Sequence, residues 1–450
     1  MADVERGVAR TASRNTTCSA ASVRTAPVHV RLTPRSRSLL RAGAVLALAL
    51  ALIETFDIEE SRSAPRSPTY AADVAPILMR NCVGCHRGGG IAPFPLLTYE
   101  DAKSHAAQIA DATRARRMPP FNLDNSGTCN TYKDARWLDD SELATISSWV
   151  AAGTPLGDST RVPPAPPPPP SLDRVDRRIE MELPYTPDPA RQDDYRCFVI
   201  DPRLDRDEFV TGFQVHPGDP RMVHHLTLFA LDTDEAEHAA AELDAAEAGP
   251  GYTCFGDTRV ESRWLVGSGP GSRALELPEG TGLRMRAGRK TVLQMHYSRA
   301  AGSTSDRTTI DLRLAPSVPV EAFIGNLANY DIAMPPGIRE ARQTAMMIVP
   351  ESVTLWGLWP HMHLMGTKLE IAVVAGGGEQ CLARVDDWNF HWQGFANYTK
   401  PIALSKDDIL KITCTYDTTS ARRLTTWGSS SDDEMCIAFL YMTPRDNSAH

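Results

Sequence analysis

The sequence has no basic excess, because 47 lysines and arginines stand against 56 aspartates and glutamates, a formal net charge of -9. Proteins that bind nucleic acid need positive charge to neutralise phosphate, so a nucleic-acid partner is excluded. The N-terminal apolar stretch AGAVLALALALI, residues 42–53, is too short for a comfortable membrane span. No internal repeat is present. A chain of 450 residues is too long for one core, which predicts several domains.

The apolar stretch is typical of an export signal, because Arg35, Arg37 and Arg41 precede it. No small-residue cleavage site follows Ile53, so the segment is either a signal that is cleaved or an anchor that is retained. A retained anchor would be the chain's only predicted link to a membrane. A buried helix of a cytosolic protein is the alternative. Cys18 lies before the stretch and eight cysteines follow it, and an even set in an oxidising compartment favours disulfides. We therefore predict a periplasmic, cell-surface or secreted protein.

A proline run, RVPPAPPPPPS at 161–171, is the clearest boundary, since such a run is stiff and cannot join a sheet. Before it, Thr98 marks the start of a helix that ends before Pro119, and DSELATISSWVAAG fits a second helix. After it, EFVTGFQV, MVHHLTLFAL, TVLQMHYS, KLEIAVVA and DILKITCTY are short and β-rich, with turn residues between them. This pattern predicts antiparallel sandwiches. The acidic, alanine-rich segment 232–248 predicts a surface helix.

The motif CVGCH is the pattern of covalent c-type haem attachment. Cys82 and Cys85 would form thioethers with the haem vinyl groups, and His86 would ligate the iron. A second axial ligand is usual and is often methionine. Met118 in RRMPPF, which follows the first predicted helix, is the predicted ligand, and His105 is its competitor.

A CxxC pair is also half of a zinc site or a redox dithiol. No second CxxC exists, however, and a histidine follows this one directly. Residues 68–158 together resemble a small class-I cytochrome c domain, in which a Met-Pro loop supplies the sixth iron ligand.

Four other stretches carry histidines and one methionine: His224 and His225 in MVHHLTLF, His296 in LQMHYS, His361 and His363 in PHMHLMG, and Met435 in DDEMCIAFLYM. Imidazole suits copper and zinc, and a thioether favours Cu(I), so a mixed set without a carboxylate cluster predicts copper. On a strand, His361 and His363 would share a face. The adjacent pair would face opposite ways unless the strand is bulged. The alternative for Met435 is a core residue, because methionine is a common filler.

The order His-His, Gln-x-His-Tyr, His-x-His, Glu-Met-Cys is similar to that of the copper type II, ascorbate-dependent monooxygenases, the family of the peptidylglycine α-hydroxylating and dopamine β-monooxygenases. The resemblance covers about residues 180–445 and implies two antiparallel jelly-roll sandwiches that face each other across a cleft. It also implies the copper ligands: His224, His225 and His296 for an electron-transfer copper, and His361, His363 and Met435 for the copper that activates dioxygen. In the family, one oxygen atom enters a substrate C–H bond, the other leaves as water, and each copper stores one of two electrons.

Two disulfides are predicted: Cys197–Cys254, flanking the His-His strand, and Cys414–Cys436, which matches a family disulfide beside the ligand methionine. Cross-linked strands hold ligands rigidly, as a preorganised metal site requires. Cys129 and Cys381 are left without an assigned partner, because a bridge between them would cross domains.

The chain departs from the family in two ways. Peptide-processing members bind the substrate carboxylate with an arginine two residues before the His-x-His, where this chain has Trp359, and with an asparagine and a tyrosine where it has Ile437 and Phe439. A carboxylate clamp without charge or hydroxyl is implausible, so we predict a more apolar substrate. The second departure is the haem domain, which is predicted to replace or supplement ascorbate as electron donor.

The predicted architecture is a small all-α cytochrome c domain followed by two all-β antiparallel jelly-roll sandwiches. Its parts are an export signal or anchor (1–60), the cytochrome domain (61–158), a proline-rich linker (159–175), a His-His-His copper sandwich (176–318) and a His-His-Met copper sandwich (319–450). The predicted function is hydroxylation of a small organic substrate by O2, with two coppers, one haem c, and ascorbate or a redox protein as further donor. The alternatives are a non-catalytic electron-transfer or copper-binding protein, and a haem-based sensor without copper.

Overall fold

The computed structural model describes residues 66–445 except 89–91, 134, 168–169, 192, 255–256, 270–272, 299–303, 376 and 429–432. The predicted export segment and Cys18 lie outside the described residues. No helix in the described part of the chain is long and apolar enough to cross a membrane.

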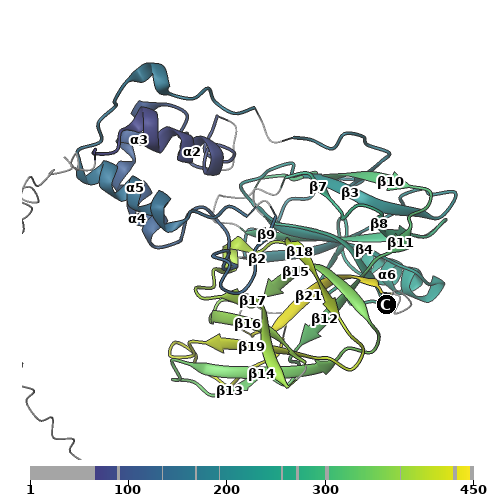
Figure 1. The fold of residues 1–450 in the computed structure, drawn as a ribbon. Coiled ribbons are helices and arrows are strands. Elements are labelled where there is room, and N and C mark those ends of the chain that lie inside the picture. The colour runs from purple at the N-terminus through teal and green to yellow at the C-terminus, as the bar shows by residue number, and fades with distance from the viewer. Residues whose placement is uncertain are drawn as a thin grey trace, which may run out of the picture. The chain divides into compact units, whose positions relative to one another are not determined.

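Helices occupy the chain before the proline run (Figure 1), with bounds η2 Tyr70–Val74, α2 Ala75–Asn81, α3 Tyr99–Ser104, α4 Ala106–Arg114, α5 Asp140–Ala151 and η3 Ser159–Arg161. Helix α3 begins as predicted after Thr98, whose hydroxyl accepts a bond from the Asp101 N–H at 3.1 Å. The single helix predicted up to Pro119 is divided at His105. The reason is that the His105 side chain donates Nδ1–H to the Asp101 carbonyl at 2.9 Å. In an unbroken helix, the His105 backbone N–H would use that carbonyl.

The first sandwich contains two sheets. One has the strand order β1-β10-β3-β8-β11, with β7 paired to β3, and the other has the order β5-β2-β9-β4-β6. The bounds are β1 Arg177–Glu180, β2 Asp193–Ile200, β3 Glu208–His216, β4 Val223–Ala230, β5 Tyr252–Thr253, β6 Arg263–Ser268, β7 Leu275–Glu276, β8 Thr281–Met285, β9 Thr291–Ser298, β10 Thr309–Ala315 and β11 Val320–Glu321. The predicted acidic helix is α6, Asp234–Ala245. Alternating apolar residues of both sheets form one buried core.

The second sandwich contains the sheets β12-β21-β15-β18 and β14-β19-β16-β17 and the short pair β13-β20. The bounds are β12 Phe323–Ala328, β13 Ala333–Met334, β14 Ala341–Ile348, β15 Val353–His361, β16 Gly366–Ala375, β17 Gly378–Val385, η5 Phe390–Trp392, β18 Ala396–Leu404, β19 Ile409–Tyr416, β20 Thr425–Thr426 and β21 Ile437–Pro444. All five β-rich segments quoted from the sequence are strands, and the prediction of β-sandwiches is confirmed in its coarse form.

A strap, defined as residues 120–133, lies between α4 and α5 in the chain but packs with the second sandwich. Tyr132 is buried in that sandwich's core and pairs with Tyr398 in an isolated β-bridge. A disulfide joins Cys129 to Cys381, 252 residues further along the chain. The two cysteines without a predicted partner are therefore partners of each other, and they fasten the strap covalently.

Candidate metal centres

Three histidines converge on the five-stranded sheet of the first sandwich. His224 and His225 lie on β4, His296 lies on β9, and His225 is directly opposite His296. The register shifts between Val223 and His225, so His224 is the extra residue of a bulge. This is the irregularity that two adjacent histidines need in order to share a site.

The Nδ1 atoms of the three rings form a nearly equilateral triangle. The distances are 3.1 Å for His224–His225, 3.2 Å for His224–His296 and 3.3 Å for His225–His296. The centre of this triangle lies about 1.9 Å from each Nδ1 atom, close to the ~2.0 Å of a metal–imidazole bond. The Asp193 carboxylate accepts a bond from His296 Nε2–H at 2.9 Å, which leaves Nδ1 of that ring with its lone pair.

Burial keeps these imidazoles neutral. It lowers the pKa of His224 to about 4, and it lowers the pKa values of His225 and His296 well below the ordinary value. Neutral rings keep their lone pairs available to a cation and do not repel it. The set is a preorganised, all-nitrogen site of the kind that copper and zinc prefer.

A second pair of imidazoles lies at the end of β15. The rings of His361 and His363 are 5.2 Å apart with their planes at 85°. The Nδ1 atom of His361 bonds to the side-chain oxygen of Gln393, and Nδ1 of His363 bonds to the Asp433 carbonyl at 3.0 Å. Both Nδ1 atoms are therefore donors, and Nε2 of each ring is the atom left to bind a metal.

A buried carboxylate, Glu434, joins this pair to Met435. It accepts bonds from the backbone N–H groups of His363 (2.8 Å) and Met435 (3.3 Å). Because the His363 N–H bonds to this side chain, β15 ends at His361, and the prediction that both histidines lie on one strand is wrong in that detail. Ile437, two residues after the methionine, pairs with His361 in the sheet. The Met435 backbone is thus next to both histidines.

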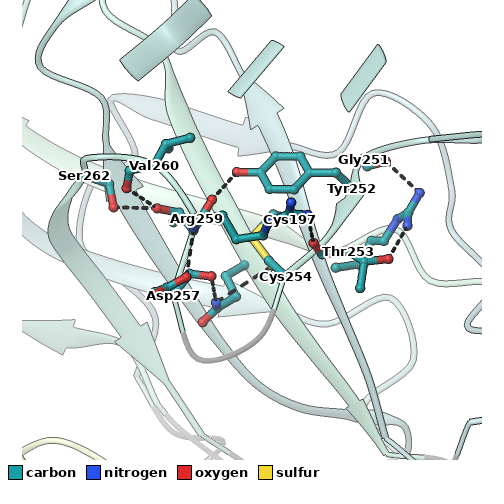
Figure 2. The surroundings of a disulfide bond; sticks show 12 residues. Cys197, Gly251, Tyr252, Thr253, Cys254, Asp257, Arg259, Val260 and Ser262 are labelled. Atoms are coloured by element: carbon teal, nitrogen blue, oxygen red, sulfur yellow. Dashed lines mark hydrogen bonds between the residues drawn. A yellow bond between two sulfur atoms is a disulfide. The ribbon is translucent and has the colours of Figure 1, made fainter. Parts of the chain in front are cut away.

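Both predicted disulfides are present. Cys197–Cys254 joins β2 to the residue after β5 (Figure 2). Cys197 pairs in the sheet with Gln294, two residues before the histidine of β9. Cys414–Cys436 fixes the residue that directly follows Met435, the candidate ligand. Each bridge therefore braces a segment that carries a candidate ligand.

One turn, residues 388–393, contacts both histidine sets, and we name it the linking turn. Its Phe390 ring stacks on His224 with centroids 5.5 Å apart, and it lies 6.2 Å from the His363 ring. Its His391 Nδ1 is 3.3 Å from His224 Nε2. Its last residue is Gln393, whose side-chain oxygen bonds to Nδ1 of His361 in the second pair.

The sequence alone does not single out His391 or Gln393 as site residues. Both lie in a short irregular segment between strands, where no periodicity indicates which way a side chain points. The only signal was the high density of aromatic and amide residues in NFHWQ. The site roles of these two residues come from tertiary contacts alone.

The CVGCH motif follows α2. Cys82 and Cys85 are free thiols, whereas the other six described cysteines are in disulfides. His86 donates Nδ1–H to the Phe94 carbonyl at 2.9 Å, which leaves Nε2 as the lone-pair donor. The Phe94 ring lies between His86 and His105, with centroids 4.7 and 3.9 Å away. The structure places Met118 in the turn after α4, where its N–H bonds to a helix carbonyl, and the axial ligand stays a prediction.

Comparison with known proteins gives matches that cover up to 61% of the chain. Residues 335–449 match the copper type II ascorbate-dependent monooxygenase C-terminal domain, a match that includes His361, His363 and Met435. Bovine (Bos taurus) dopamine beta-hydroxylase is 23% identical over 306 residues, covering 61% of this chain and 48% of the relative. Tyramine beta-hydroxylase of Caenorhabditis briggsae is 22% identical over 248 residues, covering 51% and 41%.

Peptidyl-glycine alpha-amidating monooxygenase A of Xenopus laevis is 24% identical over 261 residues, covering 56% of this chain and 26% of the relative. The chain spans about half the length, or less, of the curated relatives it matches. These matches support the copper type II monooxygenase family, whose members are oxidoreductases.

Proposed function

We propose that this chain is a copper-dependent monooxygenase that hydroxylates a C–H bond of a small organic substrate. The observation that carries the proposal is the pair of distinct donor sets, joined by a single turn. One set has three converging Nδ1 atoms, and the other has two imidazoles whose Nδ1 atoms are occupied, next to the backbone of Met435. The balance is one C–H bond, one O2, two electrons and two protons, giving one C–OH and one water. Two one-electron metal centres match that demand.

The donor chemistry favours copper at both sets. His224, His225 and His296 would hold one ion, and His361, His363 and Met435 would hold the other. Neutral imidazoles with a thioether and no carboxylate ligand suit Cu(I) and Cu(II) in turn. Bound copper would supply the one-electron chemistry that reduces dioxygen.

The surrounding residues fix the ligands before any metal arrives. The Asp193 carboxylate, the Gln393 amide and the Asp433 carbonyl each hold the ring nitrogen that faces away from the metal, and so set each ring's tautomer and orientation. Phe390 packs against His224 of one set and lies near His363 of the other.

The substrate is proposed to be apolar near the reacting carbon. Trp359 is 3% exposed, and its ring lies 5.6 Å from Trp264 of the first sandwich. Phe439 lies 4.1 Å from the same tryptophan. Three aromatic rings therefore occupy the region in which peptide-processing relatives are expected to bind a carboxylate. A group of this kind binds apolar surface and offers no counter-charge.

We also propose that the CVGCH motif holds one haem c. Two free thiols persist in a chain whose other described cysteines are all oxidised, and His86 is oriented with Nε2 available. The haem would supply electrons to the copper pair, with ascorbate or a redox protein as further donor. Three disulfides support an exported chain, because such bridges persist in oxidising compartments.

Metal analysis combined with oxygen uptake tests the function. Purified protein is expected to contain two coppers and one haem per chain, and to consume one O2 for each product molecule formed. Stopped-flow mixing should show reduced haem being reoxidised by the Cu(II) domains. Two coppers without O2 uptake would identify an electron-transfer protein instead. Haem that stays reduced would show that the haem does not donate electrons to the copper centres.

Replacing His391 with asparagine is expected to weaken copper binding at the three-histidine set about tenfold, the lower end of the range for a ligand's hydrogen-bonding partner. The reason is that His391 bonds to Nε2 of His224 and orients its ring. Copper titration followed by electron paramagnetic resonance would measure the loss. A changed Cu(II) signal separates orientation of the ligand from general destabilisation. His238→Asn is the matched control, because His238 is exposed on α6 and pairs with Glu242.

A further inference from the structure

A cavity of about 460 Å³ lies beside the linking turn, bounded by the strap and by both sandwiches. Phe121, Phe213 and Phe395 give it aromatic walls, and Trp392 and Gln393 of the linking turn also line it. Its volume falls within the range of small-molecule sites, as does its mixture of apolar walls and a few polar groups. None of the residues proposed to bind copper lines this cavity.

Most of the charged side chains that line the cavity are positive. Lys133, Arg136 and Arg273 all line it, and the only carboxylate among the described lining residues is Glu276. Glu276 is already paired with Arg313 at 3.2 Å. No described carboxylate pairs with Lys133 or Arg273. Burial lowers the pKa of Arg136; the nearby Cys85 opposes this shift, and the charge of Arg273 adds to it by a smaller amount.

Two polar atoms on the cavity wall are buried without a partner in the described part of the chain. They are the indole Nε1–H of Trp392 and the side-chain oxygen of Asn397. Buried polar groups in folded proteins are nearly always satisfied, so an unpaired N–H in a cavity that Lys133 and Arg273 also line indicates a missing acceptor. A carboxylate supplies acceptor oxygens, and a hydroxyl or water bound with it would satisfy the amide oxygen.

Three lining residues contact the two proposed redox sites. Arg136 Nη1 is 3.9 Å from Cys85 Sγ, and Arg273 Nη2 would lie 3.2 Å from a Cβ atom on Gly84. Both guanidinium groups therefore lie against the CVGC loop. Gln393 bonds to Nδ1 of His361.

We propose that this cavity binds the carboxylate groups of a flat, largely apolar molecule. Lys133, Arg136 and Arg273 supply the counter-charge, Trp392 donates its indole N–H, and the phenylalanines contact the flat body. Because Gln393 forms part of the wall, an occupant touches the residue that orients a proposed copper ligand.

Two sources share this chemistry. One source is the propionate edge of a haem attached at Cys82 and Cys85, and this alternative rests on the haem of the proposed function. The other source is a free organic acid, and this alternative does not depend on the haem. Neither source requires active copper centres. The test can therefore reject this binding site without rejecting the proposed monooxygenase activity, and the activity can be rejected without rejecting the site.

The first arm of the test measures the haem midpoint potential of the full-length holoprotein carrying Arg273→Gln. If haem propionates occupy the cavity, removal of a nearby positive charge stabilises Fe(III) and lowers the potential, and Arg273→Lys restores it. Arg339→Gln is the matched control, an exposed arginine outside the cavity lining, and should leave the potential unchanged.

The second arm titrates benzoate, a flat carboxylate, into the same proteins by calorimetry. A free-acid site predicts binding to the wild type that weakens at least tenfold in Arg273→Gln and not in Arg339→Gln, with the haem potential unaffected. A haem-propionate site predicts no benzoate binding to the holoprotein. Circular dichroism verifies that each variant is folded. The proposal is overturned if the haem potential is unchanged in Arg273→Gln and benzoate either does not bind or binds this variant as tightly as the wild type. If the chain carries no haem, the benzoate titration alone decides.

Discussion

His361→Ala is expected to leave one copper per chain and to reduce hydroxylation by well over a hundredfold, because loss of a ligand should exceed the 10–100-fold cost of losing a ligand's hydrogen-bonding partner. The ring would contribute one of the two imidazole nitrogens of the proposed His-His-Met set, and a thioether with a single imidazole is a poor copper site. The copper that remains is held by three imidazoles, so its Cu(II) resonance should show coupling to three nitrogen nuclei.

His296→Ala is the complementary variant. It removes one corner of the Nδ1 triangle, in which every edge is between 3.1 and 3.3 Å. The expected product also has one copper and no turnover, but its resonance should show coupling to two nitrogen nuclei instead of three. His216→Ala is the control, since that histidine is 44% exposed and bonds to Asp311 at 2.9 Å, with no candidate ligand as its partner. Two coppers in both ligand variants would contradict the assignment of two separate sites.

The features that the sequence could predict are those that depend on local pattern. Short β-rich runs bounded by turn residues located the strands that carry His224 and His296, and the adjacency of two histidines required a bulge, which the register shift at β4 supplies. The position of Cys197 and Cys254 on either side of the His-His strand predicted one disulfide, and the family resemblance predicted Cys414–Cys436. The Thr98 cap could be predicted because all the residues of a capping box lie within four consecutive positions.

The features that the sequence could not predict depend on contacts between distant segments. The Cys129–Cys381 bridge spans 252 residues, and the strap that carries Cys129 has no strand or helix period to reveal its partner. The linking turn is irregular, so nothing local indicates that His391 reaches the first sandwich. The end of β15 before His363 depends on a carboxylate 71 residues later in the chain.

That carboxylate, Glu434, is expected to give the second large effect. Glu434→Ala leaves the backbone N–H groups of His363, Met365 and Met435 buried without their acceptor. Each unsatisfied group costs about 1–3 kcal/mol, so the free energy of unfolding should fall by roughly 3 kcal/mol or more. The loop that carries His363 is also released from Met435. The variant should therefore lose the copper of the His361 set and keep that of the three-histidine set.

Glu434→Gln separates the hydrogen bonds from the charge. Its carbonyl keeps one acceptor, while its NH₂ faces backbone donors, so both stability and copper content should lie between those of the wild type and the alanine variant. Urea unfolding of the metal-free proteins measures the first quantity, and metal analysis after reconstitution measures the second. Glu370→Ala is the matched control, because Glu370 is an exposed carboxylate on β16 of the same sandwich. If Glu434→Ala bound two coppers and unfolded like Glu370→Ala, this carboxylate would not be what holds the methionine beside the histidines.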